Sequence, residues 1–331
     1  MTLSASKVGT SKIMYTPFIS VIIPTYNRQN TIMYCLQSVL NQTYQHFEVV
    51  IADDASTDAT VQTVKAIADS RIRVVIADKN RGAQAARNLG IRAAKGDWIA
   101  FLDSDDYWKL DKLEKQIQIL KEHNFNKKVV VHSNCELQVN GTITDTWLLP
   151  ECNGYVYNKL LLGPGPVFPS FLVAKEHLES IDLLDESVSS YQEWDTAIRL
   201  AKDGWFVHMQ EPTFVYCFHD EPTISKDKAR DIDGYLYILH KHKKEILSTN
   251  PKSYNNQIRN LIYRSIDFIL PEKARDLTNE FTIRRLRLLY RPYISFIFLL
   301  PLQHRSFFMK SLQKIYTILI NLVLRIKRSL R

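Results

Sequence analysis

The sequence has little cysteine, glycine and proline: 4 Cys, 10 Gly and 12 Pro among 331 residues. No C-x-x-C pair occurs among Cys35, Cys135, Cys152 and Cys217, which argues against a zinc site or a disulfide framework and fits a reducing compartment. Few glycines and prolines, together with 16 Tyr and 15 Phe, exclude collagen-like and globally disordered chains. A G-x-G-x-x-G motif is also missing, which removes the dinucleotide-binding dehydrogenases.

Long apolar runs are missing as well. No run reaches the roughly 18 residues that would span a bilayer. The first 18 residues are polar and lack the apolar core of a signal peptide. We therefore expect a cytoplasmic protein.

Acidic residues are absent from the last part of the chain. Residues 281–331 contain 11 Lys and Arg and no Asp or Glu, so the net charge of +8 belongs to this tail. The basic residues do not follow a nucleic-acid-binding fold, and we expect no nucleic-acid partner. Apolar and basic residues instead alternate at helical spacing, which favours an anionic membrane surface bound through residues 295–331. Packing of the tail on the catalytic domain or on a second subunit, as in a homodimer, is the alternative.

The first 125 residues alternate short apolar runs with amphipathic stretches. This pattern predicts a mostly parallel sheet covered by helices on both faces, an α/β fold. The expected strands are 19–23, 48–52, 71–77 and 98–102, and the expected helices are 30–40, 58–68 and 82–94. Polar residues follow three of these strands directly: Thr25 and Tyr26, Asp53 and Asp54, and Asp103–Asp106. Ligands of parallel sheets bind at the carboxyl ends of strands, so these groups predict one shared site.

The later residues predict a looser arrangement. A hairpin is expected from strands at 129–137 and 141–147, and a helix at 191–202. Two further strands are expected at 205–209 and 213–218. The stretch from 232 to about 270 has a helical pattern that Pro271 breaks.

The Asp103–Asp106 turn carries three carboxylates, which repel one another if packed as bare charges. A divalent cation with oxygen ligands, Mn²⁺ or Mg²⁺, is the usual remedy. A solvated acidic turn that caps the following helix is the alternative for this turn. We expect Asp106 to contact the cation directly, at a place with little core packing.

Four segments in order, VIIPTYNR, VVIADDASTD, NRGAQAARNLG and FLDSDDYW, resemble the family 2 glycosyltransferases, inverting enzymes with a GT-A nucleotide-sugar-binding fold. The resemblance implies that Pro24 and Tyr26 line the base pocket and that Asp54 binds the nucleobase, where a carboxylate suits the N3–H of uracil. It further implies ribose and metal contacts by Asp105 and Asp106, with Asp103 completing the D-x-D. A downstream histidine of the family, matched by His219, reaches the metal or the diphosphate.

Two more sets of residues complete the predicted site. Arg81 lies at the start of the third predicted helix, where a cation can meet phosphate. An inverting transfer needs a base on the acceptor side, and in SYQEWDTAIRLAKDGW the residue that matches the family's base is Glu193, with Asp195 as fallback. A charged helix N-terminus favoured by the helix dipole is the alternative for both carboxylates.

These observations predict a flexible N-terminus (1–17), a GT-A catalytic domain (18–225), a helical extension (226–280) and a basic amphipathic tail (281–331). Within the catalytic domain, 18–125 would bind the nucleotide sugar and 126–225 would hold the acceptor and the base. The predicted function is metal-dependent transfer of one sugar, from UDP-glucose or UDP-galactose first, to a hydroxyl of an undecaprenyl-diphosphate-type acceptor. The linkage would be β, in surface polysaccharide (O-antigen or capsule) synthesis at the inner face of the cell membrane.

The transfer is expected to be non-processive, because the sequence lacks the Q-x-x-R-W motif and the membrane bundle of the processive synthases. A non-catalytic, membrane-associated nucleotide-sugar-binding protein and a sugar nucleotidyltransferase are the alternative functions.

Overall fold

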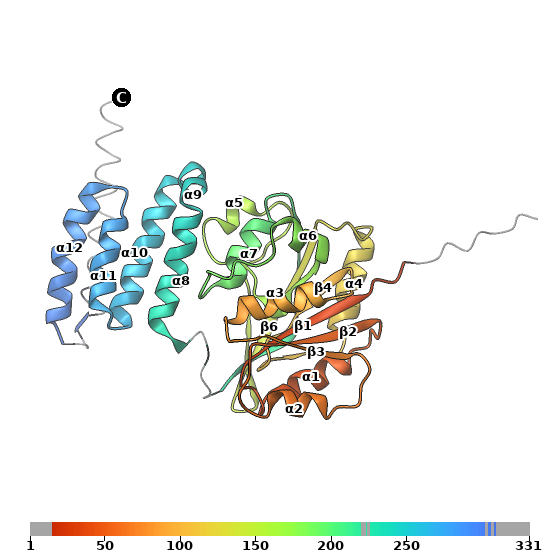
Figure 1. Cartoon of the computed structure of the whole chain (residues 1–331). Coiled ribbons are helices and arrows are strands. Elements are labelled where there is room, and N and C mark those ends of the chain that lie inside the picture. The colour runs from red at the N-terminus through yellow and green to blue at the C-terminus, as the bar shows by residue number, and fades with distance from the viewer. Residues whose placement is uncertain (1–14, 220–222, 224–225, 302–303, 306–307, 309–331) are drawn as a thin grey trace, which may run out of the picture. The chain divides into compact units, whose positions relative to one another are not determined.

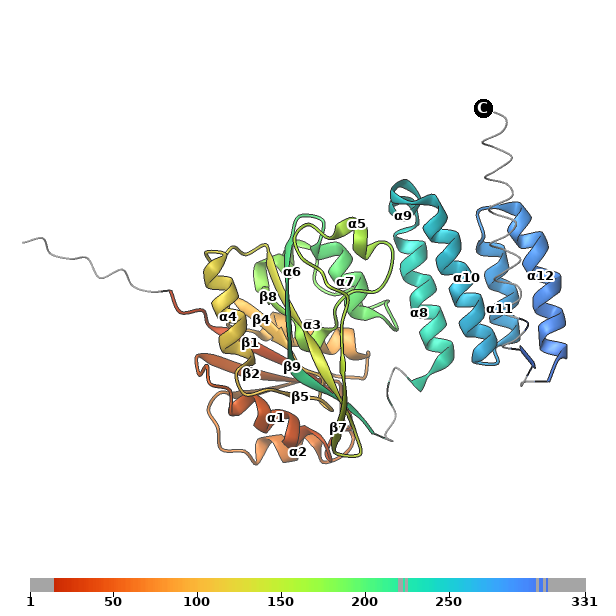
Figure 2. The same cartoon turned by 180° about the vertical axis from the view of Figure 1, so that it is seen from behind.

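The computed structural model describes residues 15–219, 223, 226–301, 304–305 and 308. The chain divides into two compact units. Unit 1 comprises residues 1–149, 168–183 and 207–218, and unit 2 comprises residues 150–167, 184–206 and 219–331. Figures 1 and 2 show the sheet of unit 1 and the helices of unit 2 from opposite sides.

Within the described residues, unit 1 is built around a nine-stranded sheet of order β3-β2-β1-β4-β8-β6-β9-β5, with β7 paired to β6. The strands are β1 (Ile19–Thr25), β2 (Phe47–Asp53), β3 (Ile72–Ile76), β4 (Trp98–Phe101), β5 (Tyr107–Trp108), β6 (Val129–Val139), β7 (Thr142–Trp147), β8 (Leu172–Ala174) and β9 (Trp205–Phe218). β1 pairs in parallel with β2 and β4, and β2 with β3. The predicted parallel sheet is confirmed for these four strands, whereas β8 pairs antiparallel with β4 and β6.

Helices cover both faces of the parallel part of the sheet, as expected for strands whose residues are apolar on both sides. Figures 1 and 2 show α3 (Ala83–Ala93) on one face and α1 (Ile32–Leu40) with α2 (Thr60–Lys65) on the other. α3 approaches β1 closely, because a Cβ on Gly90 would lie 2.6 Å from Cγ2 of Ile22. α4 (Lys112–Glu122) packs on β6, and α6 (Lys175–Ser180) follows β8.

The predicted hairpin is confirmed as β6 and β7. The two strands predicted at 205–209 and 213–218 are wrong as separate elements, because β9 runs through both. Pro212 lies inside this strand: a proline removes one hydrogen-bond donor but leaves the backbone extended.

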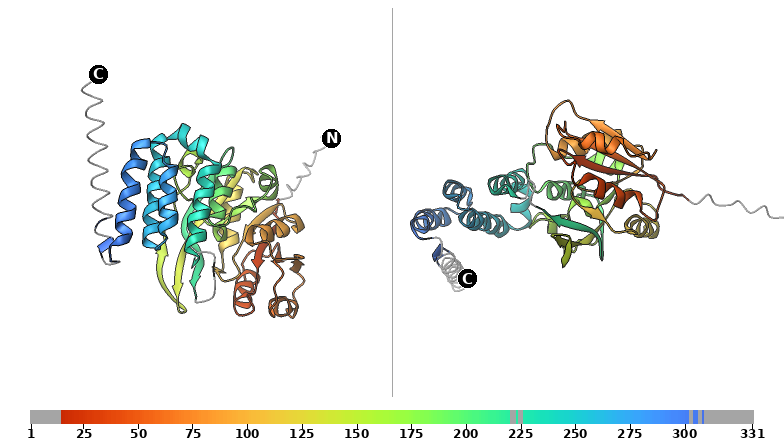
Figure 3. Two further views of the ribbon diagram at one scale, coloured as in Figure 1. Left: turned by 60° about the vertical axis from the view of Figure 1, so that its left-hand side comes forward. Right: turned by 90° about the horizontal axis from the view of Figure 1, so that it is seen from below.

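Unit 2 is helical among its described residues. It contains α5 (Tyr157–Leu160), α7 (Gln192–Leu200), α8 (Lys228–Lys241), α9 (Lys243–Thr249), α10 (Pro251–Asp267), α11 (Pro271–Leu277) and α12 (Arg284–Leu299). α10 packs on α8, α9 and α11, and α11 packs on α12, the array seen in Figure 3.

The helical stretch predicted from 232 to about 270 is three helices. α10 begins where Asn250 accepts a hydrogen bond from the backbone N–H of Lys252 and Pro251 takes the first helical position, both common at a helix start. Pro271 ends the pattern as predicted and starts α11.

The compact units differ from the predicted domain boundaries, because residues 184–206 group with the helices after residue 218. The physical reason is the packing of α7 on α8: the rings of Trp194 and Tyr235 lie 4.7 Å apart, and Asp195 forms an ion pair with Lys241. Of the tail predicted to bind a membrane, residues 302–303, 306–307 and 309–331 lie outside the described residues. Among the helices that are described, none combines the length and the hydropathy needed to cross a bilayer.

Candidate active site

Three polar segments meet at one edge of the unit 1 sheet. β1 lies between β2 and β4, its last residue Thr25 is in register with Asp53 at the end of β2, and the backbone N–H of Leu102, after β4, donates to the carbonyl of Ile22. The convergence predicted from the strand ends is therefore confirmed. This edge is where parallel sheets bind their ligands.

The loops after β1 and β2 are tied to one another. The backbone N–H of Asn27 donates to Oγ of Ser56 at 2.9 Å, and Oδ1 of Asn27 accepts from the N–H of Thr57 at 2.8 Å. Asn27 and Ala55 both have left-handed backbones, with φ of +51° and +61°. Ala55 thus occupies a conformation that usually favours glycine.

Asp54 is 3% exposed, and its two carboxylate oxygens accept the backbone N–H groups of Arg81 at 2.9 Å and Gly82 at 2.7 Å. Gly82 has φ of +93° and precedes the first residue of α3. Asp58, rather than Asp54, accepts the N–H of Thr60 at the start of α2, at 2.9 Å. Asp54 therefore fixes the entry to α3, and because a carboxylate has about four lone-pair sites it retains capacity for a further donor.

The other predicted nucleotide contacts differ in their accessibility. Pro24 is buried inside β1, whereas Tyr26 is 42% exposed just beyond the strand. The Arg81 side chain is exposed at the start of α3. Tyr26 and Arg81 thus have accessible side chains, while Pro24 is part of the strand that leads to Tyr26.

The acidic turn after β4 holds its three carboxylates in different environments. Asp103 forms an ion pair with Arg87 at 2.6 Å, and Asp105 forms one with Arg28 at 3.6 Å. Asp106 is 2% exposed, and its Oδ1 accepts the backbone N–H of Cys217 in β9 at 2.9 Å. Asp106 Oδ2 has no hydrogen-bond partner among the described residues.

The expectation that Asp106 lies where core packing is slight is therefore wrong: it is a buried residue that fastens β9 to the turn. Burial raises the pKa of the Asp106 carboxyl well above its usual range, and the carboxylates of Asp105 and Asp103 raise it further. A buried carboxylate with one unpartnered oxygen, beside two more carboxylates, fits a divalent cation.

The donor set also indicates how such a cation is held. Among the described residues, no group of three His, Cys, Asp or Glu side chains is gathered into a ready-made metal site. Mg²⁺ commonly takes one or two protein carboxylates and completes its shell with substrate phosphates and water. The turn fits a cation of this kind, whose remaining ligands are not protein side chains.

The candidate bases lie on α7 in unit 2. Glu193 is half-buried in the first turn, two residues after the N-cap residue Tyr191. Asp195 is fully buried, forms ion pairs with Arg199 and Lys241, and is hydrogen-bonded to His242, each at 2.9 Å. Although burial alone would raise it, the pKa of Asp195 is lowered to about 2 by these partners.

A carboxylate with so low a pKa is a weak proton acceptor, so the geometry disfavours the fallback base and assigns Asp195 to the folding of unit 2. The spacing of Asp195 and Arg199, four residues apart on one helix, is the signal in the sequence that pointed to this role.

His219 follows β9 and belongs to unit 2. Its backbone carbonyl accepts a hydrogen bond from Nζ of Lys226 at 2.6 Å. Its predicted contact with a metal or a diphosphate stays a prediction.

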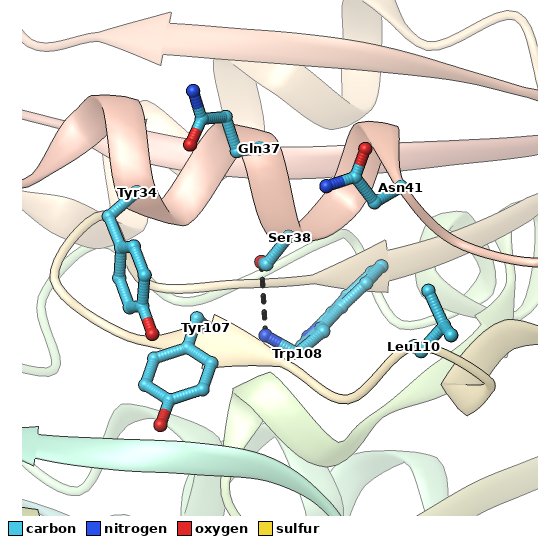
Figure 4. Close-up of a pocket in the computed structure, with 7 residues that line it drawn as sticks. All are labelled: Tyr34, Gln37, Ser38, Asn41, Tyr107, Trp108 and Leu110. Atoms are coloured by element: carbon cyan, nitrogen blue, oxygen red, sulfur yellow. Dashed lines mark hydrogen bonds between the residues drawn. The ribbon is translucent and has the colours of Figure 1, made fainter.

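A shallow pocket of about 250 Å³ lies beside the acidic turn in unit 1 (Figure 4). In it, Oγ of Ser38 accepts the backbone N–H of Trp108 at 3.1 Å, which joins α1 to β5. The lining residues come from α1 and from the chain around β5: Tyr34, Gln37, Ser38, Asn41, Tyr107, Trp108 and Leu110. The lining includes none of the predicted site residues.

Solved structures with a similar fold support this architecture. One of them is the crystal structure of S. aureus TarS 1-349 in complex with UDP-GlcNAc. It superimposes with a TM-score of 0.62 at 19% sequence identity, over 89% of this chain and 91% of that one. The similarity shows the fold, and the predicted GT-A class with a helical C-terminal extension is confirmed.

Sequence comparisons agree with this fold. Residues 20–168 match the model described as glycosyl transferase family 2, the family that the four motifs resemble. Two Escherichia coli relatives, WfgD and WfaP, are each described as a UDP-Glc:alpha-D-GlcNAc-diphosphoundecaprenol beta-1,3-glucosyltransferase. WfgD is 39% identical over 147 residues, 44% of this chain and 56% of WfgD, and WfaP is 39% identical over 132 residues, 40% and 51%. The matched region thus spans about half the length of these relatives.

Proposed function

We propose that this protein is an inverting, metal-dependent, non-processive glycosyltransferase. It moves one sugar from a UDP-sugar to a hydroxyl of a polyprenyl-diphosphate-linked sugar and forms a β linkage. The observation that carries the proposal is the buried Asp106, with one unpartnered oxygen among the described residues, at the edge of a family 2 domain where the ends of β1, β2 and β4 meet.

The donor is held by the loops at this edge. Tyr26 offers a ring to the nucleobase, Asp54 offers carboxylate lone pairs to the N3–H of uracil, and the Arg81 cation faces phosphate at the start of α3. Asp105 and Asp106 would hold Mn²⁺ or Mg²⁺, with His219 as a further ligand. When bound, the cation supplies positive charge that stabilises the departing diphosphate. Arg87 and Arg28 keep Asp103 and Asp105 in place through ion pairs.

Glu193 acts as the general base. Its carboxylate takes the proton of the acceptor hydroxyl while the hydroxyl oxygen attacks the anomeric carbon and the bond to UDP breaks. Attack from the face opposite the leaving group inverts the configuration, so an α-linked UDP-sugar yields a β linkage. Gln192 and Trp194 on either side are buried, which fixes the first turn of α7 that carries Glu193.

The substrates are proposed from the relatives. WfgD and WfaP use UDP-Glc and an undecaprenyl-diphosphate-linked GlcNAc, according to their descriptions. UDP-glucose, with UDP-galactose as the second choice, is therefore the donor to test first, and a GlcNAc diphosphate lipid is the acceptor. Such an acceptor places the reaction in surface polysaccharide synthesis.

A membrane-bound acceptor requires the enzyme to work at the membrane, and we propose peripheral attachment to the inner face through residues 295–331. The helix α12, whose residues 295–299 belong to this region, supports the proposal. Leu288, Phe296 and Leu299 on α12 are 68%, 46% and 83% exposed. The same helix carries Arg284, Arg285, Arg287 and Arg291 and no acidic residue. Exposed apolar and basic side chains together suit the interface of an anionic bilayer.

The test is a transfer assay with purified protein, Mn²⁺ or Mg²⁺, and a GlcNAc-diphosphate lipid of long chain. UDP-glucose, UDP-galactose and UDP-GlcNAc are compared, and the product is characterised by mass spectrometry and by cleavage with β-specific glycosidases. We expect one added hexose, released UDP in equal amount, and loss of activity with a chelator. Absence of transfer from all three donors, or an α-linked product, would contradict the proposal.

A further inference from the structure

Tyr191 has an unusual backbone for its residue type. It is the N-cap of α7, two residues before Glu193, and its φ and ψ of +57° and 35° place it in the left-handed region. For a residue other than glycine this conformation costs on the order of 1 kcal/mol or more, so surrounding contacts must hold it. Those contacts come from the helical extension of unit 2.

Arg264 of α10 provides the first contact. Its Nη2 donates to the phenol oxygen of Tyr191 at 2.6 Å and also forms an ion pair with Asp231 of α8. Its guanidinium carbon lies 5.5 Å from the ring centroid of Tyr191 and 5.6 Å from that of Tyr235. The same two rings pack edge to face at 5.1 Å. Arg264 thus joins α8 and α10 to the tyrosine that begins α7.

α8 also lies directly on the backbone before Tyr191. A Cβ on Gly234 would come within 2.7 Å of the backbone nitrogen of Ser190, so only glycine fits there without movement. One turn earlier, Nε of Arg230 donates to the carbonyl of Ser189 at 2.8 Å. The chain entering α7 is therefore held at consecutive residues by a single helix.

The end of α8 holds the far side of the same segment. Nζ of Lys241 contacts both Asp185 at 2.6 Å and Asp195 at 2.9 Å, and His242 contacts Asp195 at 2.9 Å. Residues 185–195 are thus fastened on both sides of Glu193 by charges from the extension.

We propose that the helical extension positions the catalytic base, and that Arg264 is a positioning residue that acts on Glu193 through Tyr191. The inference rests on the proposed function, because it takes Glu193 as the base. In this scheme Arg264 contacts neither the reacting atoms nor the donor. It fixes the orientation of the first turn of α7 and therefore the direction of the Glu193 carboxylate. Near-attack geometry is sensitive to small displacements, and a misplacement of about 1 Å can cost about 100-fold in rate.

The test uses the full-length protein and the transfer assay. Tyr191→Phe removes the phenol oxygen alone, and Arg264→Met removes the guanidinium but keeps an unbranched side chain. Tyr263→Phe is the matched control for the phenol, because Tyr263 bonds Tyr290 on α12. Lys252→Met, at the exposed start of α10, is the control for the loss of a cation. We expect kcat to fall about 10- to 100-fold in both test variants and less than twofold in both controls, with the KM for the UDP-sugar changed less than twofold.

A double-mutant cycle separates positioning from a general loss of structure. If Arg264 acts through Glu193, then Arg264→Met in a Glu193→Gln background lowers the residual rate no further. The proposal would be overturned if Arg264→Met lowered the rate by the same factor in the wild-type and the Glu193→Gln backgrounds. Wild-type kcat in both Tyr191→Phe and Arg264→Met would also overturn it. Full activity of Glu193→Gln alone would instead refute the base on which the inference depends.

Amide hydrogen exchange gives a readout that does not need turnover. Exchange within residues 185–195 should rise in Tyr191→Phe and Arg264→Met relative to their controls, while exchange in β1 and β2 stays unchanged. Unchanged exchange in 185–195 would refute the fastening itself, whether or not the protein transfers sugar.

Discussion

Replacing Asp106 by asparagine distinguishes two effects of this carboxylate: the cost of burying its charge in the folded protein, and its proposed role in holding a cation. Asparagine keeps an oxygen that accepts the N–H of Cys217, and it removes the buried negative charge. A buried polar group without a partner costs about 1–3 kcal/mol, and more when it is charged. We therefore expect Asp106→Asn to raise the free energy of unfolding, by about 1–3 kcal/mol, in metal-free buffer at neutral pH.

The pH dependence of this gain has a definite sign. The pKa of Asp106 is raised in the folded state, so folding favours its protonated form. The wild type carries no penalty below the unfolded pKa of about 4, and it loses stability as the pH rises from there toward the folded pKa. The stability difference between variant and wild type should therefore be absent near pH 3 and should grow with pH in chelator.

In the presence of Mn²⁺ and UDP, we expect the wild type to be more stable than Asp106→Asn. A ligand at 100 times its dissociation constant stabilises the folded state by about 2.7 kcal/mol, and the variant should lose most of this response. Urea unfolding measures both effects, with and without Mn²⁺ and UDP. Asp111→Asn is the control, because Asp111 is more exposed and pairs with Lys115 within α4. A variant that is less stable than wild type in chelator and yet keeps the full Mn²⁺-UDP response would refute the reasoning.

Three further predictions concern unit 2. Glu193→Gln should keep UDP affinity in calorimetry and lower kcat by about 10² to 10⁴, since an amide cannot take the proton; activity near that of wild type would exclude Glu193. Asp195→Asn should cost about 3 kcal/mol of stability in urea unfolding because it removes the charge of the buried carboxylate that pairs with Arg199 and Lys241. With the folded pKa at about 2, the stabilisation by Asp195 is present above about pH 4 and lost toward pH 2, so the variant should show a flatter acid profile. A chain that ends at residue 302 should stay in the supernatant with anionic vesicles at low salt, whereas the full chain co-sediments, and equal recovery of both in the supernatant would contradict membrane binding.

The donor side of the site was predictable from sequence because its determinants are local. Asp54 and Asp106 each follow a strand within a few residues, and parallel strands bring such ends to one edge without further information. Their environments were not predictable. The hydrogen bond from Cys217 to Asp106 joins residues 111 positions apart, and it gives a structural role to a residue that was expected where core packing is slight.

The acceptor side depends on contacts between residues far apart in sequence. Asp195 meets Lys241 across 46 residues, and Tyr191 meets Arg264 across 73. The sequence offers Glu193 as the base and Asp195 as the fallback. Only the long-range partners show that Asp195 is the centre of buried ion pairs whereas Glu193 is a half-buried carboxylate. The sequence contained one clue, the i, i+4 spacing of Asp195 and Arg199, but it did not reveal the partners on α8.

The proposed donor site and the proposed base thus depend on different parts of the chain. The family match ends at residue 168, before Glu193, and it covers the strand-end loops that would hold a nucleotide sugar. The proposed base lies on a segment that belongs to the same compact unit as the C-terminal helices. Because that unit also carries the exposed basic and apolar side chains of α12, the helices that would fix the base are continuous with those that would meet the membrane. In this scheme the helical extension is part of the catalytic apparatus. A substitution in α10 is therefore expected to lower the rate of proton transfer from the acceptor before it changes the binding of the donor.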